Sequence, residues 1–298
     1  MQGNTLKKIS TISAVSVAIF LILAKYIAWS TSGSVSILSS LVDSGVDMLA
    51  SIINLLAVYH AMKPADTDHR FGHGKIEAVA ALGQSVFIFC SSLFIMWEAI
   101  QRFIHPQPIE HAQTAIVVTC LAIVVTILLV SIQKYTIKRT KSLAIKADMV
   151  HYQSDLYLNI GVLVTLVLSS YLKTPYLDPL FGIFVGFYIV KTAHTILKEA
   201  FFILTDRELP QEKRDDIVKI IMDNPKVKGY HLLRTRSSGH GEFIQCHLEM
   251  QGNISLYKAH DIAMEVEDAL HKAFPKADIT LHQDPLEIKE DHRTEFEE

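Results

Sequence analysis

Residues 35–61 have the sequence VSILSSLVDSGVDMLASIINLLAVYHA, an apolar stretch interrupted by two acidic residues. An α-helix needs ~20 apolar residues to cross the hydrocarbon core of a bilayer, so this stretch is long enough to span a membrane. Asp43 and Asp47 are four residues apart, and a helix therefore places them on one face. An ionised Asp near the bilayer centre costs at least ~2.5 kcal/mol, so this face predicts a compensating cation or proton.

Other stretches of the same kind lie on both sides of this one. The chain has 298 residues, of which 50% are hydrophobic and 20% charged, a balance typical of a membrane domain joined to a water-soluble one. The hydropathy pattern predicts an all-α transmembrane domain of six helices, at residues 9–30, 35–61, 78–100, 115–133, 147–172 and 179–204. The first stretch follows two lysines, as a signal peptide would, but it is longer than a typical signal segment and no A-x-A cleavage pattern follows it. We therefore expect it to be the first span.

Lysine and arginine residues in the connections predict the orientation of the chain. One side of the membrane has twelve of them, namely Lys7, Lys8, Lys63, Arg70, Lys75, Lys134, Lys138, Arg139, Lys141, Lys146, Lys198 and Arg207. The other side has two, Arg102 and Lys173. Because positively charged connections stay in the cytoplasm, the bias predicts a multi-pass protein with both termini cytoplasmic.

The composition changes after Arg207, where residues 208–210 predict a linker into a water-soluble domain. Apolar spacing then predicts helix 211–224, strand 227–236, strand 242–250, helix 256–274 and strand 277–282. The order α-β-β-α-β is typical of a two-layer α+β domain with its helices on one face of the sheet. We expect three regions, a transmembrane domain at 1–207, a cytosolic domain at 208–286 and a disordered charged tail at 287–298.

Charge and cysteine content exclude several classes of protein. Lys plus Arg number 28 against 31 for Asp plus Glu, a formal net charge of −3, so there is no basic field for nucleic acid. Cys90, Cys120 and Cys246 have no C-x-x-C spacing, which excludes a disulfide scaffold and a thiolate zinc finger. Alternation in strand 242–250 predicts that Cys246 points away from His247 into the core.

Ionisable residues in the apolar stretches predict a metal site. His151 and Asp155 in stretch 147–172 repeat the four-residue spacing of Asp43 and Asp47. Three carboxylates and one imidazole suit tetrahedral Zn2+. In the alternative interpretation these groups only hydrogen-bond to other helices, with Ser44, Ser154 or Asn159 as partners. We expect Lys25 and Glu98, each near the end of a stretch, to extend to the membrane surface.

Two more groups of candidate ligands lie outside the apolar stretches. Asp66, His69 and His73 follow the second stretch and offer one carboxylate and two imidazoles for a cation, although a solvated polar loop with incidental histidines is the alternative. The cytosolic domain contributes His231, His247, His260, His282 and Asp284. These five either converge on a metal or are scattered surface residues.

These motifs together resemble those of the cation diffusion facilitator family, and closely those of its bacterial zinc and iron exporters. The resemblance covers essentially the whole chain. It implies a homodimeric Zn2+/H+ antiporter of the inner membrane that alternates between cytoplasm-facing and outward-facing states and has a ferredoxin-like cytosolic domain. His rather than Asp at position 151 resembles the zinc and cadmium branch of the family more than the manganese branch.

The resemblance also implies a role for each group of ligands. The transport site would consist of Asp43, Asp47, His151 and Asp155. The loop site would consist of Asp66, His69 and His73. A binuclear zinc site, structural or regulatory, would lie at the dimer interface of the cytosolic domains and consist of His231, His247, His260, His282 and Asp284.

The chemistry of the ligands gives a mechanism independent of the resemblance. Carboxylates and imidazoles must lose their protons to coordinate a metal, so Zn2+ and H+ compete for the same atoms and their movements are coupled. Oxygen and nitrogen ligands would also accept Fe2+, Co2+ or Cd2+. Two alternatives are an intramembrane metallohydrolase, which needs a general base such as the Glu of H-E-x-x-H that this chain lacks, and a membrane zinc sensor. We expect a transporter, not an enzyme.

Overall fold

The computed structural model describes residues 2–32, 35–105, 113–172, 176–239 and 241–286. Within them the chain divides into two compact units, a helical unit up to Leu204 and a C-terminal unit from Thr205. The expected charged tail, 287–298, lies outside the described residues.

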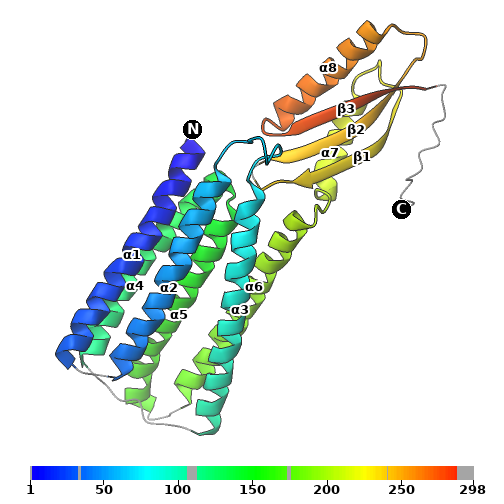
Figure 1. Cartoon of the computed structure of the whole chain (residues 1–298). Helices are drawn as coiled ribbons and strands as arrows, with labels where there is room; N and C mark the ends of the chain where they lie inside the picture. The colour runs from blue at the N-terminus through cyan, green and yellow to red at the C-terminus, as the bar shows by residue number, and fades with distance from the viewer. Residues whose placement is uncertain (1, 33–34, 106–112, 173–175, 240, 287–298) are drawn as a thin grey trace. The chain divides into compact units, whose positions relative to one another are not determined.

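Six long helices form the helical unit (Figure 1). They are α1 (Gln2–Ser32), α2 (Val35–Ala61), α3 (Lys75–Ile104), α4 (Gln113–Thr140), α5 (Leu143–Leu172) and α6 (Leu177–Leu204). Among the described residues, all but α5 contain a segment long and apolar enough to cross a membrane. The fifth helix matches the others in length but carries Asp148, His151 and Asp155 in its first half. The unit is a multi-pass membrane domain, as the hydropathy pattern predicts.

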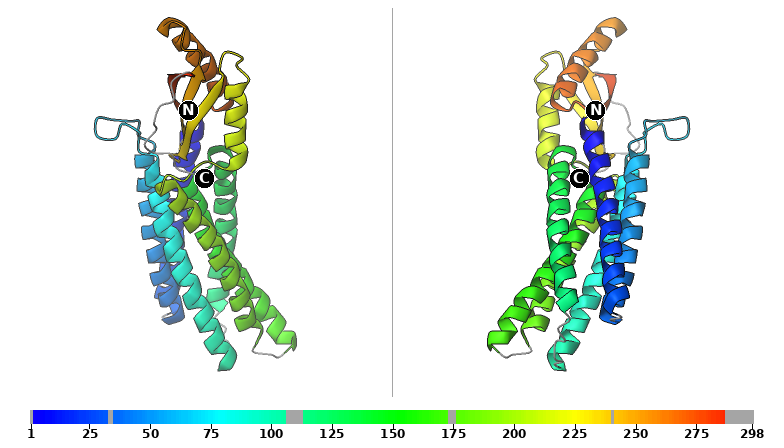
Figure 2. Two further views of the ribbon diagram at one scale, coloured as in Figure 1. Left: turned by 90° about the vertical axis from the view of Figure 1, so that its right-hand side faces the viewer. Right: turned by 90° about the vertical axis from the view of Figure 1, so that its left-hand side faces the viewer.

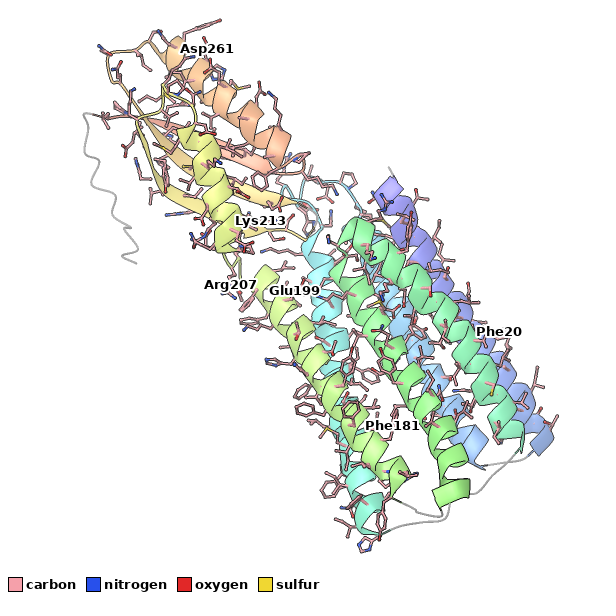
Figure 3. The ribbon with its side chains drawn as sticks, turned by 180° about the vertical axis from the view of Figure 1, so that it is seen from behind. Phe20, Phe181, Glu199, Arg207, Lys213 and Asp261 are labelled. Carbon is pink, nitrogen blue, oxygen red and sulfur yellow. The ribbon has the colours of Figure 1, made fainter. Side chains whose placement is uncertain are left out.

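The outer surface of these helices is apolar. Large hydrophobic side chains point away from the helical unit, as Phe20 does in Figure 3. The most exposed of them include Ile53, Phe94, Val117, Leu128, Phe184 and Phe187. In water an apolar surface of this size would favour aggregation, whereas in a bilayer it is the surface that contacts the lipid chains.

Helix α6 packs closely along α3, and α1 packs along both α2 and α4 (Figures 1 and 2). Gly182 and Gly186 on α6 face α3 at the contact. A Cβ at Gly182 would lie 3.1 Å from that of Ala99, and one at Gly186 would collide with Met96. Small residues four apart let two membrane helices approach closely, which compensates for the weak hydrophobic drive between helices in lipid.

A buried ion pair ties the start of α1 to the start of α3. Lys7 Nζ lies 2.6 Å from Glu77 Oε1, and the two side chains are only 6% and 2% exposed. Ser142, between α4 and α5, donates its hydroxyl to the other oxygen, Glu77 Oε2, at 2.6 Å. The carboxylate therefore connects three segments that are distant in sequence.

The C-terminal unit is a three-stranded sheet with two helices on one face. Its elements are α7 (Gln211–Met222), β1 (Gly229–Ser237), β2 (Glu242–Met250), α8 (Leu256–Ala273) and β3 (Asp278–Pro285). The central strand β2 pairs antiparallel with β1 and parallel with β3. The predicted α-β-β-α-β order is confirmed, but β3 continues three residues beyond its predicted end because it stays paired with β2 as far as Pro285. The extension places Asp284 in the sheet.

Alternation along β2 decides which residues enter the core. Ile244, Cys246 and Leu248 are buried against α7 and α8, so the prediction for Cys246 is confirmed. Burial raises the pKa of the Cys246 thiol to about 12, so the thiol stays protonated at neutral pH. Residues 245, 247 and 249 project from the opposite face of the sheet, which the two helices leave uncovered.

We expect Glu77→Ala to lower the stability of the helical unit sharply. The substitution leaves the Lys7 ammonium buried without its carboxylate, and breaking a buried pair in this way costs about 3–5 kcal/mol. The matched control is Glu199→Ala, which removes a carboxylate 2.5 Å from Lys146 in a pair whose side chains are 34% and 47% exposed. An exposed pair contributes about 0–1 kcal/mol. Melting temperatures of the purified proteins in detergent test the difference, and equal shifts would contradict it.

Candidate metal centres

Three groups of candidate ligands come together in the described part of the chain. The membrane cluster is Asp47, His151 and Asp155; the loop cluster is Asp66, His69 and His73; the sheet cluster is His231, His247 and Asp284. Within each group the ligand atoms lie within 4.8 Å of one another. Ligands 2.0–2.2 Å from a tetrahedral zinc are roughly 3.3–3.6 Å apart, so small shifts would suffice for binding.

The membrane cluster forms where α2 meets α5. His151 Nε2 lies 3.0 Å from Asp47 Oδ1 and 3.8 Å from Asp155 Oδ2. The His151 side chain is 9% exposed, whereas those of Asp47 and Asp155 are 25% and 38% exposed. The imidazole is therefore at the inner end of the cluster, and the two carboxylates face the space in front of it.

That space is a cavity of about 180 Å³ lined by Asp43, Asp47 and Asp155. Asp43 is thus part of the cavity, but it is not in the group whose ligand atoms lie within 4.8 Å of one another. The spacing of the two pairs predicted their common faces, and the contact between α2 and α5 brings the faces together.

Tyr152 lines the same cavity and contacts the helices that carry the membrane cluster. Its ring centroid lies 5.6 Å from that of His151, and its hydroxyl lies 2.8 Å from Ser51 Oγ on α2 and donates to Ala14 O on α1 at 3.3 Å. The side chain is buried, so these contacts fix α1, α2 and α5 around the ligands. In metal sites, contacts of this kind around the ligands fix the orientation of the side chains that bind the metal.

Lys25 on α1 also lines the cavity, which the sequence analysis did not foresee. Its Nζ donates to Ser44 Oγ at 2.6 Å and to Ser40 O at 3.1 Å, and the side chain is half-buried. The expectation that Lys25 extends to the membrane surface is therefore wrong, because its ammonium is held by acceptors on α2. Glu98 is exposed and pairs with Arg102 one turn along α3 at 3.0 Å.

The loop cluster is built on a turn between α2 and α3. Asp66 Oδ1 accepts the backbone N–H groups of Asp68 at 3.0 Å and His69 at 2.7 Å. These bonds, chiefly that from His69, lower the pKa of Asp66, so its carboxylate stays ionised below the usual range. His69 Nδ1 and His73 Nε2 lie 3.4 and 3.3 Å from the same carboxylate. One carboxylate thus faces two imidazoles.

The sheet cluster follows from strand register. His231 on β1, His247 on β2 and His282 on β3 are direct cross-strand neighbours on the helix-free face. The Asp284 carboxylate lies against all three: Oδ2 is 2.7 Å from His247 Nδ1 and 3.2 Å from His231 Nε2, and Oδ1 is 3.0 Å from His282 Nε2. Each oxygen of this carboxylate therefore faces at least one imidazole.

Two residues of the C-terminal unit qualify this picture. Glu249, two positions after His247 on the same face of β2, lies with Oε1 2.9 Å from His231 Nδ1, and the period-two alternation of the strand could have revealed it. His260 is exposed on α8 and belongs to none of the ligand groups found among the described residues. The β1 backbone is also strained at one residue next to the cluster, since Leu232 has φ +50° within the bulge that follows His231.

Comparison with known proteins gives consistent matches over the whole chain. The family model for the cation efflux transmembrane domain matches residues 11–205, and that for the cation efflux protein cytoplasmic domain matches residues 209–286. The cation-efflux pump FieF of Klebsiella pneumoniae is 46% identical over 279 residues, which cover 94% of this chain and 93% of that protein. Cation-efflux pump FieF of Pectobacterium atrosepticum is 46% identical over 278 residues, 93% of this chain and 92% of that protein.

Among solved structures, the metal-bound C-terminal domain of the CzcD transporter from Thermotoga maritima is 27% identical. The match covers 28% of this chain and all of that one, with a TM-score of 0.26.

We expect Asp284→Ala to abolish most of the rise in melting temperature that zinc produces in the C-terminal unit. The carboxylate contacts all three histidines of the sheet, and ligand binding at 100 times Kd stabilises a folded state by about 2.7 kcal/mol. The matched control is His271→Ala, which removes an exposed α8 histidine whose partner is Glu267. Melting curves of the full-length protein with and without zinc measure the effect. A full zinc-dependent rise in the Asp284 variant would exclude the sheet cluster as a metal site.

Proposed function

The chain belongs to the cation efflux family of membrane transporters, also called the cation diffusion facilitators, and from that premise we propose that it exports Zn2+ from the cytoplasm in exchange for protons. A transporter of this family moves divalent cations out and is not an enzyme. The proposal adds the identity of the metal, the coupling ion and the residues that bind the cargo.

The observation that carries the proposal is the membrane cluster. An imidazole and two carboxylates lie within 4.8 Å of one another inside helices that are otherwise apolar, beside a cavity that a third carboxylate also lines. Such groups are rare in membrane helices because they are costly, and they mark pathways for ions or protons. Mixed nitrogen and oxygen ligands in a four-ligand set suit Zn2+, and they favour it over the harder Mn2+.

Proton coupling is supported by the same ligands. His151 Nε2 faces Asp47 at hydrogen-bond distance, so in the empty cluster a proton occupies a position that a metal would take. Binding of Zn2+ displaces that proton, and reprotonation from the outer side displaces the metal. An alternating-access cycle in which the cluster faces each side in turn would therefore exchange the two ions in opposite directions.

We propose the loop and sheet clusters as sites that remain occupied instead of releasing cargo. Both lie outside the long apolar segments, and the sheet cluster is on the face of the sheet that the helices leave open. The family model for the cytoplasmic domain supports an arrangement in which this unit faces the cytoplasm, and the family supports a homodimer in the inner membrane. A zinc sensor is the second function that the sheet cluster would allow, but it gives no reason for ligands inside the membrane.

We expect Asp47→Ala and Asp155→Ala to abolish zinc flux while the protein stays folded. Each substitution removes a ligand from the membrane cluster, so the ligand set falls short of the four that a tetrahedral zinc site needs. Glu98→Ala is the matched control, since it removes an exposed carboxylate of α3 whose partner is Arg102. The measurement is zinc uptake into sealed proteoliposomes with and without an imposed pH gradient. Flux at the wild-type rate in either cluster variant would exclude the cluster, and flux indifferent to the pH gradient would exclude proton exchange.

We expect His151→Asp to admit Mn2+ and to weaken the preference for Zn2+. The substitution makes the membrane cluster all-oxygen, and hard oxygen ligands suit Mn2+ better than imidazole does. Competition between the two metals in the same vesicle assay gives the ratio of rates. An unchanged ratio would show that residue 151 does not set selectivity.

A further inference from the structure

Lys25 is the one charged residue of the cavity that the proposed function does not use. It reaches the cavity from α1, where the other lining residues of that helix are Ala18 and Leu21. The spacing of seven residues from Ala18 to Lys25 keeps all three on one face of the helix, and this face packs along α2. Lys25 therefore faces the cavity because of its position on α1.

The acceptors of Lys25 lie on the same helical face as the carboxylates. Ser40, Asp43, Ser44 and Asp47 follow one another on α2 at spacings of three, one and three residues, which a helix gathers into one stripe. The Lys25 ammonium is bound to two members of this stripe, Ser44 Oγ and Ser40 O. These two hydrogen bonds fix the ammonium beside the acidic residues of the stripe, Asp43 and Asp47.

Lys25 does not form a direct ion pair with a carboxylate in the described part of the chain. Its two hydrogen bonds go to a hydroxyl and a carbonyl, and within the described ranges no carboxylate oxygen lies within 4.0 Å of its Nζ. Its charge therefore acts on Asp43, Asp47 and Asp155 across the cavity. A unit charge at such a range matters inside a protein, because the effective dielectric there is ~20 or less instead of ~80.

We propose that Lys25 is the resident counter-ion of the membrane cluster, which compensates its carboxylates when no metal is bound and opposes the metal by repulsion when one is. The inference rests on the proposed function, in which the cluster must bind its cargo and then release it. A fixed cation lowers the cost of the empty, ionised cluster in the membrane. The same cation weakens binding of Zn2+, and weaker binding speeds its release.

The alternative role for Lys25 is that of a clamp between α1 and α2. The two roles predict opposite effects of removing the charge. Loss of a clamp would loosen α2 and weaken metal binding, whereas loss of a counter-ion would strengthen it. The direction of the change in zinc affinity therefore separates them.

The experiment is calorimetric titration of zinc into purified full-length protein in lipid nanodiscs. Lys25→Gln removes the charge and keeps a donor for Ser44 and Ser40, Lys25→Met removes both, and Lys25→Arg keeps the charge. Each Lys25 variant is compared with the wild type, both as a single substitution and combined with Asp47→Ala. Zinc binding that is lost on adding Asp47→Ala is assigned to the membrane cluster. We expect the Gln and Met variants to bind zinc at the cluster at least about tenfold more tightly, the Arg variant to bind as the wild type does, and maximal flux to fall in the two neutral variants.

Unchanged or weaker binding in folded Lys25→Gln or Lys25→Met protein would overturn the inference. So would a tightening that persists in the Asp47→Ala background, because the affected site would then lie elsewhere. Failure of the proposed function has a different signature, in which Asp47→Ala removes no zinc site and no flux. Melting temperatures without zinc identify a variant that has lost its fold, and the other neutral variant then provides the measurement.

Discussion

Ionisable groups inside apolar helices must be compensated by one another, and the helical unit is arranged around that constraint. Asp43, Asp47 and Asp155 line one cavity, and His151 lies against Asp47 and Asp155. Convergence requires that α1, α2 and α5 hold a fixed relation, which the Tyr152 hydroxyl secures by contacting Ser51 and Ala14. The close packing of α3 on α6 completes the frame without any charged contact at Gly182 and Gly186.

The pattern of the sequence predicts whatever depends on a period along one element. Four-residue spacing places Asp43 with Asp47 and His151 with Asp155, and two-residue spacing separates His247 from the core residue Cys246. These relations are set by backbone geometry alone. The six long helices follow from the length of the apolar stretches and the α-β-β-α-β order from apolar spacing, and only the ends of the elements differ from the prediction.

What depends on contacts between elements could not be predicted in this way. Lys25 lies near the end of its apolar stretch, and only the position of α2 beside α1 shows that Ser44 Oγ and Ser40 O accept hydrogen bonds from its ammonium. The pair of Lys7 and Glu77 joins residues 70 apart in sequence, so no local pattern marks it. The family resemblance implies that Asp284 is a ligand, but its contact with all three strand histidines depends on the extension of β3 beyond its predicted end.

The charged residues next to the sheet cluster and the membrane cluster have opposite signs, as the roles proposed for the two clusters require. In the sheet cluster, Glu249 accepts or shares a hydrogen bond with His231 Nδ1, and a carboxylate behind a ligating imidazole makes it a stronger ligand. In the membrane cluster, the neighbouring fixed charge is the ammonium of Lys25, which opposes a cation. Under the roles proposed above, these surroundings would favour retention of a metal in the sheet cluster and its release from the membrane cluster. A site that holds its metal and a site that passes it on can be built from the same residue types, because the next charge outward decides how long the metal stays.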